Sequence, residues 1–505
     1  MKLSPSGVSL VAGSDITGGG QPFTATDPQT GAALDPSYHA ISHEQLDSAV
    51  TAAVQASHTR IDHATMGAAL DAAAEAFEAS GDAVVASADA ETALGRTRLE
   101  GELARTIGQL RMMATEARAG TRRDRVSDPA GDGPAAPALL RTTVPLGVVG
   151  VFAASNFPLA FGVAGTDTAA ALGAGCPVVA KAHPAQPATA ELCGRLIAAG
   201  LAAAELHPGF FSVVHEQGTD IGQALTLHDG FDAVAFTGSH VGGRALFDLA
   251  ASRDRPIPVY AEMGSMNPLF VSPGAAAERA EQITQGIFGS YLQGEGQFCT
   301  KPGLIILPDT PGGGHVLDGL LRLLDSRSPA HPLLHDGIKT AFAKGAAAAA
   351  DIDGVVAFHA PAADAGGQAV LFQATVKALM DHPALRQELF GPAAVVVQAS
   401  DAEMRDIGDV IDPALTATLH FTPAESDWAA SMADQLARKV GRVIADGYPT
   451  GVRVSPAQHH GGPYPATTSP LHTSVGLAAI DRFLRPVTFQ NFDSTALPGW
   501  ARPDA

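Results

Sequence analysis

Short apolar runs alternate with helical patterns from residue 140 onward, and this alternation predicts most of the fold. β-Branched and other apolar residues form runs of four to six positions, and Ala-rich stretches with apolar residues at helical spacing separate them. Such alternation predicts a parallel sheet with right-handed crossovers and a ligand site beyond the carboxyl ends of its strands. The predicted strands end at Phe152 and span Pro177–Ala180, Phe211–Val214, Ala233–Phe236 and Pro258–Ala261, and the predicted helices span Thr166–Ala174, Ala188–Ala204, Asp220–Leu227 and Val241–Ala251.

The chain on either side of this part follows other patterns. Residues 1 to about 40 are rich in Gly, Pro, Thr and Asp and predict loops with short strands, and a cluster of Pro, Gly and Asp at 128–137 predicts a break. A second α/β stretch runs from Met263 to about Tyr448, and the tail at 480–492 alternates enough to form a strand that could join another subunit. The remaining predicted helices are 43–58, 65–80, 82–120, 276–292 and 315–324, and the remaining predicted strands are 304–307, 394–397 and 417–421.

Composition narrows the functional class. The chain has 505 residues, enough for two or three sub-domains, and its formal charge of −20 disfavours nucleic acid and anionic membrane surfaces as partners. Its apolar run at 148–180 contains Asn, Pro and several glycines, so we expect a strand, a helix and a strand there and no membrane span. The 3 cysteines are too scattered for a disulfide framework or a thiolate metal site, the histidines show no ligand spacing, and no secretory signal is evident at the N-terminus. We therefore expect a cytoplasmic protein without a metal site.

One cysteine stands out because of its setting. Cys299 lies in the glycine-rich segment 294–303 after an apolar helical run, and Lys301 follows it closely. Partial exposure and nearby positive charge favour a reactive thiolate. A lone cysteine is more often a small buried apolar residue, so this segment alone does not decide between a nucleophile and a core residue.

Three polar residues follow predicted strands and are further candidates. Asn156 could donate its amide to an oxyanion or could cap a turn. Glu262 follows a buried strand, so we expect desolvation to raise its pKa, as suits a general base, although it could also pair with an arginine. Lys181 could contact a ribose or phosphate, or could be solvated.

Two segments could hold a dinucleotide. Thr237-Gly238-Ser239 leads from a strand into a helix that contains Gly242, and glycines beside a helix N-terminus let backbone N–H groups approach a pyrophosphate. The spacing is not G-x-G-x-x-G, so an ordinary turn explains the segment equally well. Glu388, in Glu-Leu-Phe390-Gly-Pro, could hold a ribose diol or could be a solvated glutamate.

Taken in order, these segments resemble the aldehyde dehydrogenase superfamily over nearly the whole chain. The resemblance implies that Cys299 is the nucleophile, Glu262 the general base and Asn156 an oxyanion donor. It implies cofactor contacts from Lys181, Thr237, Gly238, Ser239, Gly242, Glu388 and Phe390. It also implies an α/β fold with two Rossmann-like parallel-sheet domains and a small β oligomerisation flap, in a homodimer or homotetramer.

The implied domain boundaries follow the same resemblance. A dinucleotide-binding domain would comprise residues 1–122 and 146–262, a catalytic domain 263–455, and oligomerisation strands 123–145 and 484–500.

Within the family, the chain is most similar to the 2,5-dioxovalerate (alpha-ketoglutaric semialdehyde) dehydrogenases, with NADP-dependent fatty aldehyde dehydrogenases just behind. The similarity lies in the segments 101–111, 155–175, 181–184 and 479–490. It implies hydrolytic, non-acylating oxidation of 2,5-dioxopentanoate to 2-oxoglutarate through a thiohemiacetal and a thioester. Oxidation of medium or long-chain aldehydes is the alternative, and a non-catalytic dinucleotide-binding scaffold is an alternative of another class.

Two departures from the family pattern matter. The family's Glu-Leu-Gly-Gly-Lys is here Glu262-Met-Gly-Ser-Met266, which keeps the base but changes the turn after it. Pro184 stands where NAD-preferring members often have a glutamate, three residues after Lys181. Without that carboxylate to repel a 2′-phosphate, we expect NADP to serve at least as well as NAD.

Overall fold

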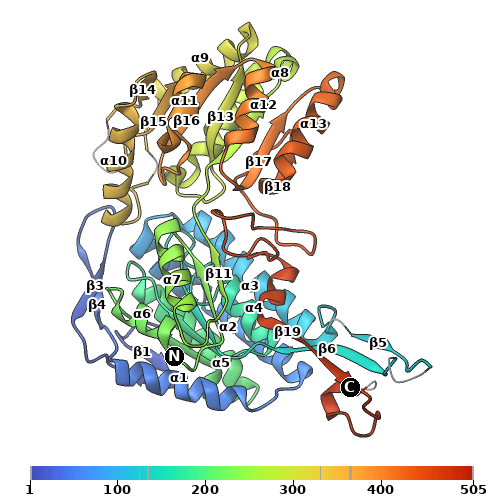
Figure 1. The fold of residues 1–505 in the computed structure, drawn as a ribbon. Coiled ribbons are helices and arrows are strands. Elements are labelled where there is room, and N and C mark those ends of the chain that lie inside the picture. The colour runs from blue at the N-terminus through green and yellow to red at the C-terminus, as the bar shows by residue number, and fades with distance from the viewer. Residues whose placement is uncertain (1–2, 124, 133–135, 330, 363–366, 503–505) are drawn as a thin grey trace.

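Two seven-stranded sheets organise the protein, which is described by a computed structural model for residues 3–123, 125–132, 136–329, 331–362 and 367–502. The sheets lie in two bodies, one above the other in Figure 1, and a slender three-stranded arm projects from the lower body. The predicted α/β class is confirmed. Residue 124, residues 133–135 of the predicted break and arm, and residues 330 and 363–366 of the predicted catalytic domain lie outside the described residues.

The first sheet has the strand order β11-β10-β7-β8-β9-β1-β2. The first five strands in this order, from the edge strand β11 to β9, pair in parallel, and β1 adds antiparallel to β9. The strands are β1 (Ser9–Val11), β2 (Ser14–Ile16), β7 (Val149–Phe152), β8 (Val178–Lys181), β9 (Phe211–Val214), β10 (Ala233–Thr237) and β11 (Val259–Glu262). β7 and β8 with the helix between them fill the apolar run at 148–180, as predicted. None of the described helices combines the length and apolar character needed to cross a bilayer.

Helices cover both faces of this sheet (Figure 1). They are α1 (His43–Ser57), α2 (His63–Thr92), α3 (Arg96–Ala119), α4 (Thr166–Ala174), α5 (Pro187–Ala203), α6 (Asp220–Leu227) and α7 (His240–Ala251). The break predicted between residues 80 and 82 is wrong, because α2 continues to Thr92. Gly81 does not end the helix; it lets α3 approach, since a Cβ there would lie 2.8 Å from Leu103. The chain turns at Ala93 and Gly95, which both have positive φ.

The second sheet has the order β14-β15-β16-β13-β12-β17-β18 and is parallel except where β14 meets β15. The strands are β12 (Asn267–Val271), β13 (Pro302–Pro308), β14 (Val355–His359), β15 (Val370–Ala374), β16 (Ala393–Ala399), β17 (Ala414–His420) and β18 (Val440–Ala445). The helices are α8 (Pro273–Leu292), α9 (Pro311–Asp325), α10 (Asp336–Ala350), α11 (Val376–Asp381), α12 (Asp401–Val410) and α13 (Ser426–Ala437). The inner strands β12, β13, β16 and β17 are buried almost along their whole length, which explains their continuous apolar runs, whereas the edge strands β14 and β18 are partly exposed.

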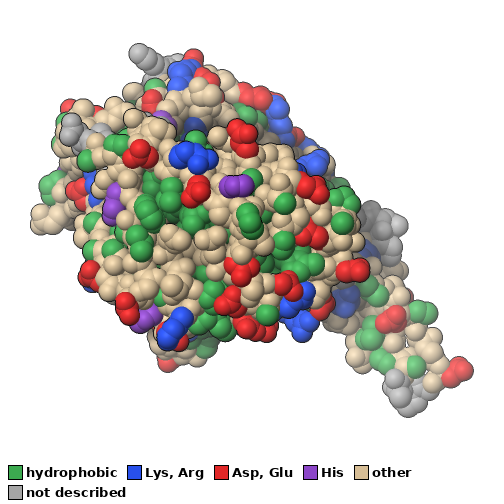
Figure 2. Space-filling model, turned by 90° about the horizontal axis from the view of Figure 1, so that it is seen from above, with side chains coloured by type: hydrophobic (Ala, Val, Ile, Leu, Met, Phe, Trp, Pro, Cys, Tyr) green, Lys and Arg blue, Asp and Glu red, His purple; other side chains and the backbone are tan. Residues whose placement is uncertain are grey.

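The arm consists of β5 (Val126–Asp128), β6 (Leu139–Pro145) and β19 (Leu484–Gln490). β19 pairs antiparallel with β6 from Leu484 opposite Pro145 to Gln490 opposite Leu139. Figure 2, a view perpendicular to Figure 1, also shows the arm extending away from the body. The predicted strand at 480–492 is wrong at its start, because residues 480–483 belong to the 3₁₀ helix η5 (Leu477–Phe483), whose apolar side chains pack in the core.

The remaining elements are short. β3 (Pro22–Thr26) and β4 (Ala33–His39) form a hairpin against the first body. The other 3₁₀ helices are η1 (Pro208–Phe210), η2 (Gln293–Gly296), η3 (Pro383–Arg386), η4 (Pro423–Glu425) and η6 (Gly499–Ala501).

Candidate functional site

The site forms where the two bodies meet, from segments far apart in the sequence. Glu262 ends β11 of the first sheet, and Cys299 lies between η2 and β13 of the second. The turn before Cys299 requires glycine at Gly296, where φ is 66° and a Cβ would lie 2.0 Å from the carbonyl oxygen of Gly391. The turn that precedes Cys299 therefore packs directly against the backbone at Gly391.

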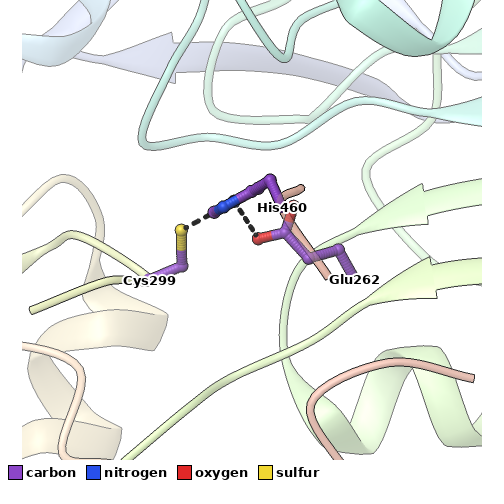
Figure 3. A group of neighbouring side chains, drawn as sticks. All are labelled: Glu262, Cys299 and His460. Carbon is purple, nitrogen blue, oxygen red and sulfur yellow. Dashed lines mark hydrogen bonds and ion pairs between the residues drawn. The ribbon is translucent and has the colours of Figure 1, made fainter. Parts of the chain in front are cut away.

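A histidine joins the cysteine to the glutamate (Figure 3). The Nε2 atom of His460 lies 3.7 Å from the Sγ of Cys299 and 3.0 Å from Oε1 of Glu262. The same nitrogen, Nε2, faces both the thiol and the carboxylate, so the three groups form a triangle. The arrangement is not a relay in which Nδ1 and Nε2 would each contact one partner. A single proton can therefore be exchanged among sulfur, nitrogen and oxygen.

The irregular segment between β18 and η5 holds the histidine in place. Thr467 pairs with Glu262 in an isolated antiparallel bridge, and the hydroxyl of Ser474 donates to Oε2 of Glu262 at 2.6 Å. The backbone N–H of His460 donates to Thr473 Oγ1 at 2.8 Å. Sequence reasoning missed both His460 and Ser474. The adjacent histidines His459 and His460 were the one sequence feature that could have indicated this part of the site. Their spacing from the cysteines and from acidic residues matches no known ligand pattern, so nothing in the sequence was a reason to select them.

The charges around the thiol differ from the sequence-based expectation. Burial, Glu262 and Glu388 raise the pKa of Cys299 well above its ordinary value, although the nearby Arg105 lowers it. Lys301 does not promote the thiolate, because its Nζ points away and donates to three backbone carbonyls, those of Leu389, Gly391 and Ala393. The expectation that Lys301 activates the thiol is therefore wrong, and this lysine ties two loops together.

Glu262 also differs from expectation. Burial raises the pKa of its carboxyl, but His460, Ser474 and the Cys299 thiol together hold that pKa below its usual value. The predicted increase is wrong because desolvation was considered without the partners that the fold supplies. The carboxylate is thus charged at neutral pH and can stabilise an imidazolium at His460.

Asn156 lies beside the cysteine turn. Its side-chain Nδ2 donates to the backbone carbonyl of Gln297 at 3.0 Å, and the backbone carbonyl of Asn156 accepts a hydrogen bond from Arg98 at 2.6 Å. The ring of Phe157 packs edge-on against Phe298, with centroids 5.0 Å apart. The amide is therefore oriented toward the segment that carries the nucleophile, and its second N–H is left for another acceptor.

The strand ends β8 and β10 form a second cluster. Lys181 is buried, and its Nζ lies 3.5 Å from Oε2 of Glu216, an acid that sequence reasoning did not consider. Thr237 has a buried hydroxyl that finds no hydrogen-bond partner among the described residues. Gly238 is required because a Cβ would lie 2.5 Å from the ring of Phe236. Ser239 caps α7 by accepting from Gly242 N–H at 3.2 Å.

These residues fit a dinucleotide. The N-terminus of α7 offers N–H groups and partial positive charge to a pyrophosphate, and Gly238 permits its close approach. The Thr237 hydroxyl, unpaired within the described ranges, could bond to such a ligand. Val241, on the first turn of α7, is 78% exposed and provides an apolar surface for a planar base.

Glu388 and Phe390 lie on the other side of the cysteine turn. The Glu388 carboxylate abuts Gly264, where a Cβ would lie 2.1 Å from its Oε2. Its Oε1 is buried and has no hydrogen-bond partner in the part of the chain that the structure describes. Burial raises the pKa of Glu388 to about 7. Phe390 is partly buried in the same loop, which Lys301 anchors through the neighbouring carbonyl of Leu389. The structure thus places Glu388 near both Glu262 and Cys299.

Comparisons with known proteins agree with this arrangement. A sequence model described as the aldehyde dehydrogenase family matches residues 16–312. The chain is 40% identical over 504 residues to alpha-ketoglutaric semialdehyde dehydrogenase 2 of Azospirillum brasilense, covering 97% of this chain and 95% of the relative. It is 39% identical over 469 residues to alpha-ketoglutaric semialdehyde dehydrogenase of Acinetobacter baylyi, covering 90% and 88%.

Solved structures share the fold. An aldehyde dehydrogenase from Bacillus cereus, solved with NAD⁺, superposes with a TM-score of 0.82 at 20% identity over 96% of each chain. An aldehyde dehydrogenase from Physcomitrella patens, solved with the reaction product succinate, gives a TM-score of 0.81 at 18% identity over 97% of this chain and 99% of that one.

Proposed function

The chain belongs to the aldehyde dehydrogenase family, and on that premise we propose that it oxidises 2,5-dioxopentanoate (alpha-ketoglutaric semialdehyde) to 2-oxoglutarate. It is an NAD(P)-dependent enzyme that converts an aldehyde to a carboxylic acid. The observation that carries the proposed mechanism is the triangle of Cys299, His460 and Glu262. The names of two relatives at about 40% identity, each aligned over most of its length, support the substrate.

The first chemical step is thiol addition. His460 Nε2 accepts the proton of the Cys299 thiol, and the charged Glu262 carboxylate stabilises the resulting imidazolium. The thiolate attacks the aldehyde carbon and forms a thiohemiacetal. Asn156 Nδ2 and the Cys299 backbone N–H donate to the developing oxyanion. Asn156 must give up or share its bond to the Gln297 carbonyl, which its second N–H allows.

A nicotinamide held at this site would supply the hydride acceptor needed to oxidise the thiohemiacetal to a thioester on Cys299. Thr237, Gly238, Ser239, Gly242 and Lys181 would hold the dinucleotide, with Glu388 and Phe390 on the far side of the cysteine turn. Glu262 then activates a water that hydrolyses the thioester, and Ser474 keeps its carboxylate aimed at the site. Because Glu262 is present, release by water is expected and transfer to a thiol acceptor is not.

We propose NADP as a cofactor at least as good as NAD. Pro184 removes one acid from the ribose-binding region, which supports this choice, and Lys181 could pair with a 2′-phosphate. The Glu216 carboxylate beside Lys181 opposes it. The balance between the positive charge of Lys181 and the negative charge of Glu216 decides the preference between NADP and NAD, and Glu216→Gln tests it.

The setting and assembly are also proposals. We propose a cytoplasmic enzyme, because Cys176, Cys193 and Cys299 are all free thiols. The projecting arm, together with Phe492, which follows β19 and is 52% exposed, supports a homodimer or homotetramer built through segments 123–145 and 484–500. We also propose a dinucleotide-binding domain (1–122 and 146–262) and a catalytic domain (263–455), and the grouping of the strands into two sheets supports this division. Light scattering of the purified protein measures the assembly, and a monomer at micromolar concentration would contradict it.

A substrate panel tests the function. The purified protein is assayed by reduced-cofactor absorbance with 2,5-dioxopentanoate and with hexanal. We expect a kcat/KM at least about 10-fold higher for 2,5-dioxopentanoate, whereas the reverse preference would indicate a fatty aldehyde dehydrogenase. Cys299→Ala should abolish turnover with both aldehydes. Absence of turnover in the wild-type protein would favour a non-catalytic binding scaffold.

A further inference from the structure

Helix α3 turns a row of polar side chains toward the catalytic loop. Arg98, Glu102, Arg105 and Gln109 recur at helical spacing on the face that contacts residues 156–166. Three of them have partners there. Arg98 donates to the Asn156 carbonyl, Glu102 Oε1 accepts from the N–H groups of Leu159 and Ala160 at 2.8 and 3.0 Å, and Gln109 accepts from Thr166. These partners explain why a helix against the core carries such polar residues.

Arg105 has no such partner. Its Nε and Nη2 are both buried, and neither has a hydrogen-bond partner in the described part of the chain. Its guanidinium lies 5.1 Å from the ring centroid of Phe161 and 5.9 Å from that of Phe157. A buried donor without an acceptor costs free energy, so two on one side chain are unusual unless a ligand supplies the acceptor.

The two unpaired groups belong to the same edge of the guanidinium. Nε–H and one N–H of Nη2 point in parallel, and this edge binds both oxygens of a carboxylate. Burial lowers the pKa of Arg105, and the charge of Glu102, one turn away on α3, opposes that shift. In the described part of the chain the two side chains make no ion pair: Glu102 Oε1 accepts from two backbone donors, and Glu102 Oε2 is buried without a partner. The edge is therefore free for a carboxylate from outside the chain.

Arg105 also lies beside the reacting groups. The Phe161 ring, over which it sits, is 6.4 Å from the His460 ring, and Phe157 packs against Phe298, the neighbour of Cys299. The charge of Arg105 interacts with both Cys299 and Glu262 and lowers the pKa of the thiol. A short substrate could therefore reach both Cys299 and this arginine.

We propose that Arg105 binds the distal carboxylate of the substrate through Nε and Nη2 while Cys299 attacks the aldehyde at the other end. This subsite rests on the proposed function. It extends the expected substrates from one compound to a class, the short-chain aldehydes that end in a carboxylate. A fatty aldehyde would bury a methyl group against the arginine and leave both N–H groups unpaired, which disfavours it. Three other arginines are less suitable for this role. Arg111 pairs with Glu78 at the surface, Arg453 is exposed, and Arg482 pairs with Asp167.

The test compares two aldehydes of equal chain length, 2,5-dioxopentanoate and pentanal. Arg105→Met should lower kcat/KM for 2,5-dioxopentanoate about 100-fold more than for pentanal, which corresponds to loss of a bidentate charged contact. Any effect of Arg105 on the thiol pKa acts on both aldehydes and cancels in this ratio. Arg111→Met, on the outer face of the same helix, is the matched control and should leave the ratio unchanged. Arg105→Lys should recover part of the preference for 2,5-dioxopentanoate over pentanal, because lysine restores the positive charge but not the two parallel N–H donors.

A binding measurement covers the case in which Arg105→Met does not fold. Glutarate, a five-carbon dicarboxylate, should inhibit the wild-type enzyme competitively with aldehyde, and the uncharged analogue pentanamide should bind at least about 10-fold more weakly. Equal inhibition by the two compounds, or an equal loss for both aldehydes in Arg105→Met, would overturn the subsite. If the wild-type enzyme instead prefers hexanal but glutarate still binds through Arg105, the proposed substrate fails and the carboxylate subsite stands.

Discussion

The imidazole of His460 lies 3.0 Å from the Glu262 carboxylate and contacts the thiol of Cys299 with the same nitrogen. This sharing couples the two proton transfers that the reaction requires, one from the thiol and one from the hydrolytic water. His460 is thus the group through which the nucleophile and the base influence each other.

His460→Gln should lower kcat about 100-fold, because the thiol loses its proton acceptor. Gln cannot take the proton but occupies similar space, so the thermal midpoint should change little. Steady-state kinetics and calorimetry measure both effects. The neighbouring His459→Gln is the control, and an unchanged kcat in His460→Gln would show that the thiol ionises without this histidine.

Glu262→Gln should separate the two half-reactions. The thioester still forms, but its hydrolysis should slow by about 100-fold or more because the base is gone. Rapid mixing should then show a burst of reduced cofactor close to one per active site, followed by a slow phase. Mass spectrometry should detect the acyl group on Cys299. A variant that shows slow turnover with no burst would place Glu262 in the first half-reaction.

Alkylation of Cys299 should report its raised pKa. The thiolate reacts and the thiol does not, and because the pKa lies above the ordinary value of about 8.5, little thiolate exists at pH 7. The iodoacetamide rate for the protein without cofactor should therefore keep rising from pH 7 to above pH 8.5. Glu262→Gln removes an anion that raises this pKa and should accelerate labelling at a given pH. A rate that is constant above pH 7 would contradict the assigned direction.

Glu216→Gln should shift the enzyme toward NADP. The carboxylate beside Lys181 would repel a 2′-phosphate, and Gln keeps an acceptor for the N–H groups at the start of α6. We expect the ratio of kcat/KM for NADP to that for NAD to rise about 10-fold, equivalent to about 1.4 kcal/mol. Lys181→Met should change the ratio in the opposite direction. A wild-type kcat/KM much larger with NAD would contradict the cofactor proposal itself.

Zinc should inhibit the enzyme reversibly. The ligand atoms of Glu262, Cys299 and His460 lie within 4.8 Å of one another, and tetrahedral Zn²⁺ separates its ligands by roughly 3.3 to 3.7 Å. The scattered cysteines and histidines gave no sign of this cluster. Calorimetry should detect about one high-affinity Zn²⁺ per chain, with affinity at least about 10-fold weaker in His460→Gln. EDTA should restore activity, and Mg²⁺, which prefers oxygen ligands, should not inhibit.

Local sequence patterns predicted most helices and strands well, because the buried face of each element determines the spacing and number of its apolar residues. The strand Phe211–Val214 and the helices Thr166–Ala174 and Asp220–Leu227 have the predicted boundaries. Errors occurred where a residue's local preference was overruled by packing. Gly81 continues a helix because α3 packs against it, and residues 480–483 are helical because their apolar side chains fill the core.

The sequence by itself determined which segments carry chemistry, because a cysteine after a glycine turn and acids at strand ends are recognisable from their neighbours. Only the tertiary structure decided their electrostatics. His460 and Ser474, both far from Glu262 in the sequence, lower the pKa of its carboxyl. Lys301 donates to three backbone carbonyls and not to the thiol, and Arg105 faces the site from α3, which lies far before Cys299 in the chain. Charge interactions depend on distance in space, and spacing along the chain does not encode that distance until the two sheets are brought together.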